Sequence, residues 1–257
     1  MPHNRYLPND LSDDARLRAF AFPSAGGGAA AYFRMRRQIP TPIDLVPVLL
    51  PGREGRIADS PRDDMRALVT EIADAIAPLD ARPFALVGHS MGAWIAFELA
   101  RELRRRGEPL PCALVAIASP APQRRQTDTP IHALRDDDLV AEISRRFGGI
   151  PPAVQANQEL MQLLLPALRA DMRLVETYEY IEEPPLATDV IALGGADDRA
   201  VSATAIGEWR QQTSQAFTNR LWPGGHFFLF PPDQQAATVL PPAMKWIATR
   251  LQKYAES

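Results

Sequence analysis

The stretch Phe84-Ala-Leu-Val-Gly-His-Ser-Met-Gly92 decides how this chain of 257 residues folds. Its first four residues are apolar, as in a buried strand, and they lead directly into two glycines that flank Ser90. Beyond this point apolar side chains recur every four residues, which is close to the period of an amphipathic helix. These side chains are Met91, Ile95, Leu99 and Leu103. The stretch therefore predicts a strand, a tight turn and a helix, with Ser90 at the turn.

Glycine is expected at positions 88 and 92 because the turn is tight. Side chains there would collide with neighbouring backbone, and strained dihedral angles are easiest for glycine. The Ser90 hydroxyl then projects above the sheet edge at a helix N-terminus, where backbone N–H groups favour developing negative charge. A G-x-S-x-G motif in this setting is the nucleophile elbow of α/β-hydrolases, which predicts Ser90 as a nucleophile. A glycine-rich turn without chemistry is the alternative.

A serine hydroxyl needs a base to accept its proton, and the chain has four histidines. His226 lies between the last predicted strand and the final helix, in Trp222-Pro-Gly-Gly-His226-Phe-Phe. His3 is close to the N-terminus, His89 is inside the elbow, and His132 opens the helical segment described below. Because α/β-hydrolases carry their residues in the order Ser, acid, His, we predict His226 as the general base.

The acid that orients the histidine is expected on the loop after the preceding strand. Two candidates stand there side by side, Asp197 and Asp198. Asp198 fits a G-x-x-D-x-x-V pattern that runs from Gly195 to Val201, so we favour it and keep Asp197 as the alternative acid. The other aspartate is expected to cap the following helix.

An oxyanion hole requires two backbone N–H groups that face the developing charge. Met91, which follows the nucleophile, is predicted to supply one of them. The second is expected from the loop after the first strand, Phe22-Pro-Ser-Ala25-Gly-Gly-Gly28, with Ala25 as the candidate. The triple glycine is weak evidence for a phosphate-binding loop, since it lacks both the P-loop Lys-Ser/Thr and a G-x-G-x-x-G pattern.

Short apolar runs alternate with helical patterns along the chain, which predicts an α/β fold: a mostly parallel sheet with helices on both faces. Together with the elbow, this alternation favours the α/β-hydrolase fold. Strands are expected at residues 17–22, 44–49, 84–87, 113–118, 189–193 and 218–222. Helices are expected at about residues 62–77, 91–106 and 242–253, with Gly107 as the C-cap of the second.

Residues 120–185 interrupt this alternation. They contain two helical patterns in succession with no strand between them, one of them across Pro166, where a kink is expected. We predict that residues 120–185 form an inserted helical lid within one domain that spans residues 1–257. Two ordinary crossover helices are the alternative interpretation.

The composition is that of an ordinary globular protein, with 46% hydrophobic and 23% charged residues. A net charge of −3 argues against a nucleic-acid partner, because no basic surplus exists to neutralise phosphates. Cys112 has no second cysteine to pair with, no signal peptide is visible, and no apolar run is long enough to cross a membrane. We therefore expect a cytoplasmic monomer without membrane attachment, metal or cofactor.

Five motifs occur together in an order that resembles the type II thioesterases associated with polyketide synthases and nonribosomal peptide synthetases. The resemblance extends from about residue 20 to 240, and Ser24 departs from it, since the family often has histidine there. The motifs are Phe22-Pro-Ser-Ala-Gly-Gly, Leu50-Pro-Gly-Arg53-Glu54-Gly-Arg56, Gly88-His-Ser-Met-Gly92, Leu168-Arg-Ala-Asp171 and Gly224-Gly-His226-Phe-Phe.

The resemblance implies an enzyme of antibiotic biosynthesis that hydrolyses stalled or aberrant acyl groups from the phosphopantetheine arms of carrier proteins. Its partners would be acyl carrier and peptidyl carrier protein domains, and a lid would cover the chamber that receives the arm. Carrier proteins are usually acidic, so four arginines are candidate contacts: Arg124, Arg125, Arg145 and Arg146. A small-molecule carboxylesterase or medium-chain acyl hydrolase is the second hypothesis, and a non-catalytic binding module is the third.

Overall fold

The computed structural model of the chain describes residues 4–8, 10–39, 41–76, 82–124, 129–148, 150–230 and 240–256. Within these ranges six strands form one sheet in the order β2-β1-β3-β4-β5-β6, and every neighbouring pair is parallel. The strands are β1 (Leu17–Phe22), β2 (Ile43–Pro47), β3 (Phe84–His89), β4 (Ala113–Ile117), β5 (Asp189–Gly195) and β6 (Phe217–Trp222). The predicted parallel sheet is confirmed, with strand ends that differ from expectation by one or two residues.

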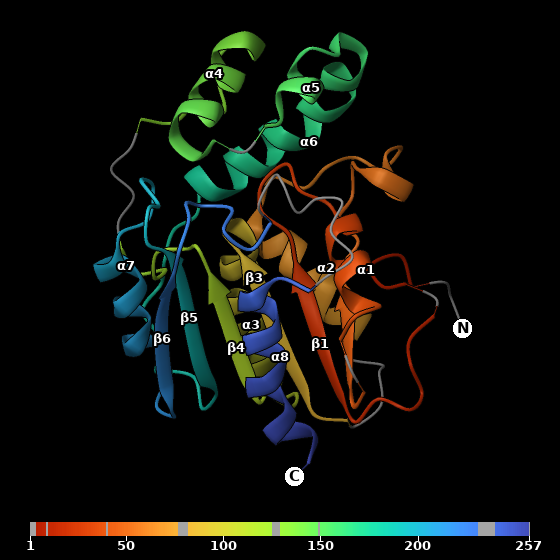
Figure 1. Cartoon of the computed structure of the whole chain (residues 1–257), viewed down its shortest axis with the longest axis vertical. Helices are drawn as coiled ribbons and strands as arrows, with labels where there is room; N and C mark the ends of the chain where they lie inside the picture. Colours follow the sequence, from red (N-terminus) through yellow and green to blue (C-terminus); the bar gives the residue numbers. More distant parts are fainter. Residues whose placement is uncertain are drawn as a thin grey trace.

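Helices cover both faces of this sheet, as predicted (Figure 1). α2 (Met65–Ile76) and α3 (Met91–Arg106) pack on one face, while α1 (Ala30–Arg36) and α8 (Pro242–Ala255) pack on the other. α2 begins three residues later than expected, because Asp64 accepts a hydrogen bond from the N–H of Ala67 at 2.7 Å and so caps it. Gly107 ends α3 in the left-handed conformation, at φ 70°, which confirms the predicted C-cap.

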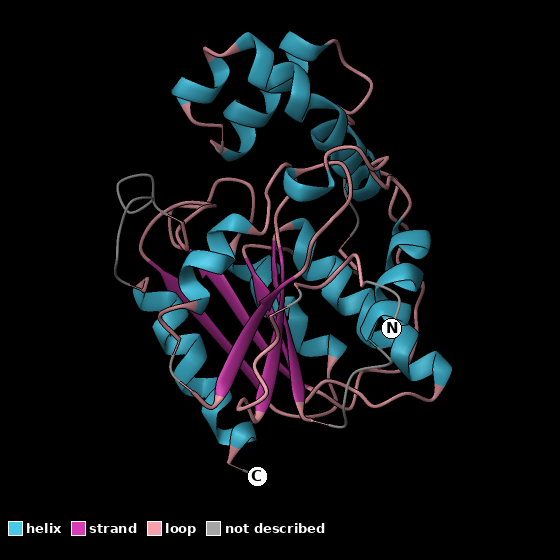
Figure 2. Cartoon of the chain, turned by 90° about the vertical axis from the view of Figure 1, so that its right-hand side faces the viewer, coloured by secondary structure: helices cyan, strands magenta, loops and turns pink. Residues whose placement is uncertain are grey.

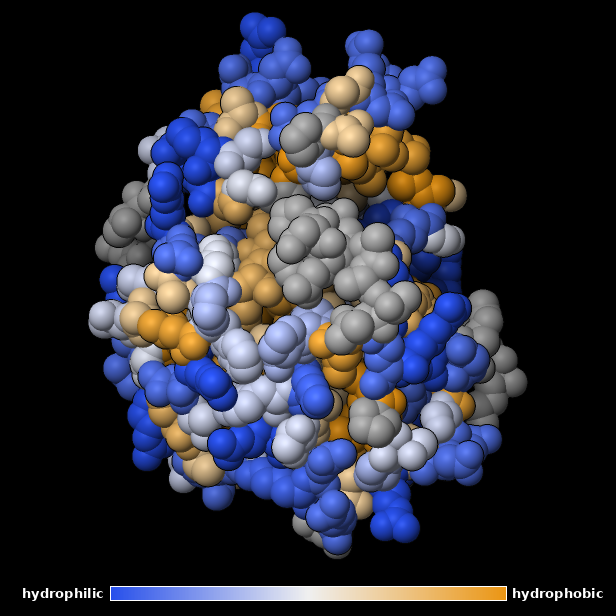
Figure 3. Space-filling view, in the orientation of Figure 1, coloured by the Kyte–Doolittle hydropathy of each residue, from blue (hydrophilic) through white to orange (hydrophobic). Residues whose placement is uncertain are grey.

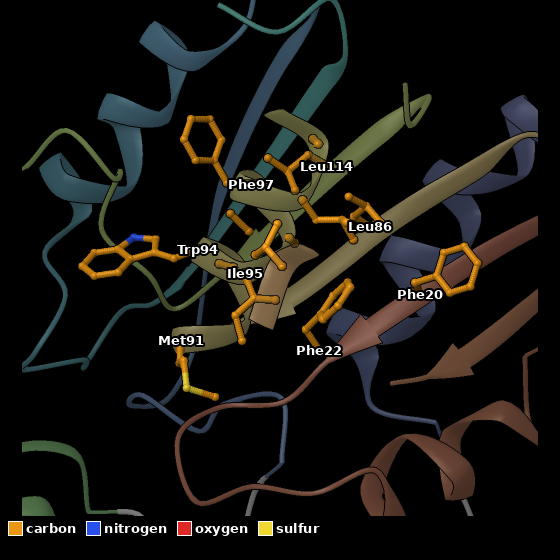
Figure 4. Packing of buried hydrophobic residues seen from close by; sticks show 14 of the residues in the cluster. Phe20, Phe22, Leu86, Met91, Trp94, Ile95, Phe97 and Leu114 are labelled. Atoms are coloured by element: carbon orange, nitrogen blue, oxygen red, sulfur yellow. The ribbon is translucent and has the colours of Figure 1, made fainter. Parts of the chain in front are cut away.

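The two faces of the sheet bury different sets of side chains. Along β1, Phe20 and Phe22 point toward α3, whereas Ala19 and Ala21 point toward the opposite face, as the alternation of a strand requires. Figure 4 shows the cluster that contains the two phenylalanines: Phe22 lies beside Ile95 of α3, and Phe20 lies further along β1. The elements beside the nucleophile candidate are therefore anchored in a buried core.

The strand order determines where loops gather. β1 lies between β2 and β3, so the chain leaves β1 toward one side of the sheet and returns to its other side. Ligands of such open parallel sheets bind at this switch point, beyond the carboxyl ends of the strands. The loop after β1, which contains Ala25, and the turn after β3, which contains Ser90, both lie there.

The described residues of the segment between β4 and β5 form three helices that lie above the sheet (Figures 1 and 2). They are α4 (Asp136–Phe147), α5 (Pro152–Gln155) and α6 (Gln158–Glu176), and α6 continues through Pro166. α4 and α6 share an apolar cluster, and Ala25 of the β1 loop packs against it. In Figure 3 hydrophobic residues gather where these helices meet the body of the molecule, and hydrophilic residues dominate their outer side.

Several short helices were not expected from the sequence. They include α1, α5, α7 (Ala203–Gly207) and two turns of 3₁₀ helix at Glu54–Arg56 and Glu208–Gln212. Segments of three to seven residues show too few turns for a period to be recognised, which explains why pattern analysis missed them.

Candidate active site

Ser90 occupies the sharp turn between β3 and α3, as predicted. Its backbone adopts φ 54° and ψ −117°, a conformation that residues other than glycine rarely adopt. The turn is held by hydrogen bonds on both sides of the serine, from Ser90 N–H to the Ile117 carbonyl at 2.7 Å and from Ala93 N–H to the Ser90 carbonyl at 3.0 Å. The side chain remains partly exposed. The turn thus presents the hydroxyl at the N-terminus of α3.

The two flanking glycines are required by close approach of the backbone. A Cβ at Gly88 would lie 2.1 Å from the carbonyl oxygen of Gly92. A Cβ at Gly92 would lie 2.3 Å from the carbonyl oxygen of Phe22. These contacts confirm the predicted collisions, and they show that the β1 loop packs directly on the elbow.

Ser90, His226 and Asp198 form a continuous series of hydrogen bonds. His226 Nε2 lies 3.0 Å from Ser90 Oγ, and His226 Nδ1 lies 2.9 Å from Asp198 Oδ2. The three residues come from three different loops, after β3, β5 and β6. The histidine and aspartate side chains are only 4% and 1% exposed. Such an arrangement can transfer the serine proton to the imidazole while the carboxylate fixes the tautomer.

The structure separates the two neighbouring aspartates. Asp198 turns inward, and its Oδ1 also accepts hydrogen bonds from the N–H groups of Ala200 and Val201 at 2.8 and 3.1 Å. Asp197 is exposed and accepts from Gly224 N–H at 3.2 Å. The expectation that the second aspartate caps the next helix is wrong, because Ser202 caps α7. Asp197 instead connects the β5 loop to the loop that carries the histidine.

The environment of Asp198 favours its charged form. Burial raises the pKa of this carboxyl group, but the hydrogen bond and charge of His226 and the two backbone N–H donors lower it by more. The pKa of Asp198 therefore lies below its ordinary value, and the group is ionised at neutral pH. An ionised partner stabilises the imidazolium that forms when His226 accepts a proton.

Both candidate oxyanion donors lie beside the elbow. Met91 is the first residue of α3, where a backbone N–H has no partner within the helix. Ala25 lies on the loop that follows β1. Immediately before this loop, the Phe22 carbonyl accepts a hydrogen bond from the Tyr32 hydroxyl at 3.2 Å. Among the described residues, no hydrogen bond engages the N–H of Ala25. Met91 and Ala25 therefore stay the candidates for binding an oxyanion.

One residue of the helical segment reaches the histidine. Phe147 ends α4, and its ring centroid lies 5.1 Å from that of His226. No local sequence signal indicates this contact, because the two residues are 79 positions apart. α4 therefore contacts His226 directly, through Phe147.

Two other features are absent from the part of the chain that the structure describes. It holds no group of three or more His, Cys, Asp or Glu side chains that could bind a metal ion. None of its helices is long and apolar enough to cross a membrane.

A sequence profile described as "Thioesterase domain" matches residues 18–240, which is most of the chain. The chain belongs to the thioesterase family. Among curated relatives of this thioesterase, the Gramicidin S biosynthesis protein GrsT of Aneurinibacillus migulanus is 37% identical over 228 residues, covering 88% of this chain and 89% of that protein.

Solved structures show the same α/β-hydrolase fold. The RedJ thioesterase from the prodiginine biosynthetic pathway in Streptomyces coelicolor has a TM-score of 0.82 at 35% identity, covering 93% of this chain and 91% of that one. The type II thioesterase BorB from the borrelidin biosynthetic cluster has a TM-score of 0.83 at 32% identity, covering 97% of each chain. The expected family and fold are both confirmed.

The thioesterase carries a second buried histidine that sequence reasoning assigned no role. His89 ends β3, and its Nε2 lies 2.9 Å from the carbonyl oxygen of His226, so this nitrogen carries the proton and donates it. Burial, and next the nearby charge of His226, lower the pKa of His89 from 6.5 to about 3. The position of His89 at the end of a predicted buried strand was the sequence feature that could have indicated a buried, neutral histidine. His89 is neutral and supports the backbone of His226.

This buried histidine predicts a pH dependence of stability. Below pH 6.5 the unfolded chain binds a proton at His89 that the folded chain excludes until about pH 3. The contribution of neutral His89 to the free energy of unfolding is therefore complete above pH 6.5. As the pH decreases below 6.5, this contribution falls by up to about 1.4 kcal/mol per pH unit. His89→Gln, which keeps an N–H donor but does not titrate, should therefore show a shallower decline. Urea unfolding between pH 7 and 4.5 measures both slopes, and parallel slopes would contradict the prediction.

Proposed function

We propose that this thioesterase hydrolyses stalled or aberrant acyl groups from the phosphopantetheine arms of acyl and peptidyl carrier proteins, as a type II enzyme of polyketide or nonribosomal peptide biosynthesis. The observation that carries the proposal is the hydrogen-bonded series of Ser90, His226 and Asp198 at the switch point of the sheet. The names of its relatives, which refer to biosynthetic pathways and a type II thioesterase, support the class of substrate.

In this proposal Ser90 is the nucleophile and His226 is the general base. Ser90 Oγ attacks the thioester carbonyl carbon while His226 Nε2 accepts its proton. The N–H groups of Ala25 and Met91 stabilise the oxyanion. The C–S bond then breaks, and His226 returns the proton to the pantetheine sulfur. A water molecule, deprotonated by His226, attacks the acyl-enzyme, and Ser90 Oγ leaves with that proton as the free acid forms.

We also propose that residues 120–185 act as a lid within one domain of residues 1–257. The contact of Phe147 with the His226 ring supports this role, because it places the end of α4 beside the reacting groups. A lid at this point limits the length of the acyl chain that fits and shields the reacting groups from bulk solvent until the hydrolytic water enters. A cytoplasmic monomer remains our expectation.

The carrier-docking role of the four arginines gains little support. Arg124 pairs with Glu208 at 2.9 Å, and Arg146 pairs with Glu142 at 3.0 Å. Arg145 also contacts Glu142, at 2.7 Å. Arg125 lies outside the described residues. Because the described candidates already have acidic partners, a carrier protein would have to compete with them.

A substrate panel tests the proposed function. Purified enzyme is offered acylated carrier proteins, the same acyl groups on free pantetheine, and p-nitrophenyl esters of the same acids. We expect kcat/KM to be highest on the carrier-bound thioesters, since the carrier adds binding energy that small substrates lack. Efficient ester hydrolysis without carrier thioester hydrolysis would instead identify a small-molecule carboxylesterase.

A further inference from the structure

A buried ion pair lies near the active site and takes no part in the proposed proton transfers. Arg53 Nη1 lies 2.7 Å from Asp171 Oδ2, and Arg53 Nη2 lies 2.8 Å from Asp171 Oδ1, a bidentate geometry. The two side chains are 6% and 3% exposed. Burial lowers the pKa of Arg53, but the charge and hydrogen bonds of Asp171 raise it by more, so the guanidinium stays charged.

A buried ion pair by itself is weak evidence for stabilisation, because desolvation offsets the attraction. Its other contacts are therefore informative. Asp171 Oδ2 accepts a hydrogen bond from Gly26 N–H at 2.8 Å, and Arg53 Nη1 donates to the carbonyl of Gly27 at 2.9 Å. The pair thus binds the two residues that directly follow Ala25, the candidate oxyanion donor. It fixes the peptide units on one side of that N–H.

The same loop is enclosed by two rigid elements. On one side a Cβ at Gly92 of α3 would lie 2.3 Å from the Phe22 carbonyl oxygen. On the other side a Cβ at Gly26 would lie 2.7 Å from Leu168 Cδ1 of α6. Leu168 and Asp171 are three residues apart and so face the same side of that helix. The loop is therefore held between the elbow and the helical segment above it.

We propose that Arg53 and Asp171 are a positioning pair for the oxyanion hole. The pair holds the loop so that the Ala25 N–H faces the charge that develops at the substrate carbonyl. Arg53 also neutralises Asp171, whose bare negative charge would oppose an oxyanion nearby. Because Asp171 belongs to α6, the lid helix is itself part of the framework that positions the oxyanion donor. This inference rests on the proposed function.

Removal of Asp171 is expected to impair catalysis rather than binding. Losing one oxyanion donor lowers kcat by roughly 100- to 1000-fold, and a donor that is displaced rather than removed should lower kcat by less. For Asp171→Ala we therefore expect kcat on a p-nitrophenyl ester to fall by about 10- to 100-fold, with KM changed less than about threefold. Asp171→Asn retains an oxygen that accepts from Gly26 N–H, and it should retain more activity than alanine.

A tetrahedral inhibitor separates positioning from general damage. An alkylboronic acid adds to Ser90 Oγ and places an oxygen where the oxyanion forms. We expect its affinity for Asp171→Ala to fall in proportion to kcat/KM. The midpoint of the pH–rate profile should stay in place, because the hydrogen bonds of His226 to Ser90 and Asp198 do not involve Asp171. A purely structural role instead predicts unchanged boronic acid affinity and unchanged kcat for the folded variant at a temperature well below Tm.

Asp44→Asn is the matched control. Asp44 pairs with Arg36 at 2.8 Å, its side chain is 3% exposed, and it lies near the start of β2, at the edge of the sheet opposite the carboxyl ends. This variant should lower Tm and leave kcat and boronic acid affinity within about twofold of the parent enzyme.

The outcomes are distinguishable. Folded Asp171→Ala with unchanged kcat and boronic acid affinity overturns the positioning pair. If that variant does not fold, Asp171→Asn and Arg53→Lys decide, since lysine keeps the charge but loses the bidentate geometry. Unchanged kcat in both of these also overturns it. Failure of the parent enzyme on carrier thioesters, with esters still hydrolysed, overturns only the proposed substrate.

Discussion

Replacement of Ser90 by alanine is expected to abolish turnover, with a loss in kcat on the order of 10⁴-fold or more. The hydroxyl forms the covalent bond in the proposed mechanism, and no other nucleophile lies within reach of His226 Nε2 among the contacts of the described residues. Alanine keeps the same backbone demands as serine and removes only the oxygen. Stopped or continuous assays of thioester and ester hydrolysis both measure the effect.

Binding provides the control for this variant. Ser90→Ala should still bind an acylated carrier protein with affinity close to that of the parent enzyme, because the hydroxyl serves chemistry rather than docking. A variant that hydrolyses either substrate at the parental rate would exclude Ser90 as the nucleophile. Loss of both binding and turnover would indicate damage to the fold instead.

The second large effect is expected from Asp198→Asn. An asparagine amide N–H facing His226 donates a hydrogen bond to Nδ1, so the imidazole proton moves to Nε2. A protonated Nε2 cannot accept the proton of the Ser90 hydroxyl. The histidine is then in the wrong tautomer, and such a change lowers kcat by about 10⁴-fold in serine hydrolases. Steady-state kinetics at neutral pH with a p-nitrophenyl ester measures the loss.

Asp197→Asn is the adjacent control for this test. Asp197 is exposed, and among the described residues its hydrogen bonds join the backbone of Gly224 on the histidine loop. The kcat of Asp197→Asn should remain within about threefold of the parent, since the hydrogen bonds of Asp197 among the described residues do not involve Ser90 or His226. An equal loss for the two variants would mean that Asp197 also supports catalysis.

The sequence predicted much of the geometry of the candidate site because the signals of the elbow are local. The elbow combines a buried strand, two glycines and a helical period within 20 residues, and the position of His226 follows from chain order. The choice of Asp198 over Asp197 rested on spacing, and the structure places Asp198 beside the histidine.

The contacts that pattern analysis missed join distant parts of the chain. Arg53 and Asp171 are 118 residues apart, and His89 meets the carbonyl of His226 across 137 residues. No periodicity links such positions, so the motifs around Arg53 and Asp171 were visible while their pairing was not. The partner of Asp197 was misjudged for the same reason, because Gly224 lies on another loop.

The backbone of Ser90 has a consequence for how firmly the chain holds its fold. A residue other than glycine at φ 54° destabilises the folded chain by on the order of 1–3 kcal/mol. Glycine avoids this strain but lowers the free energy of unfolding by about 0.4–1 kcal/mol, because it gives the unfolded chain more conformational freedom. Ser90→Gly should therefore unfold at a higher temperature than Ser90→Ala, although both lack the hydroxyl. The difference in unfolding temperature between the two inactive variants would measure the backbone strain at position 90.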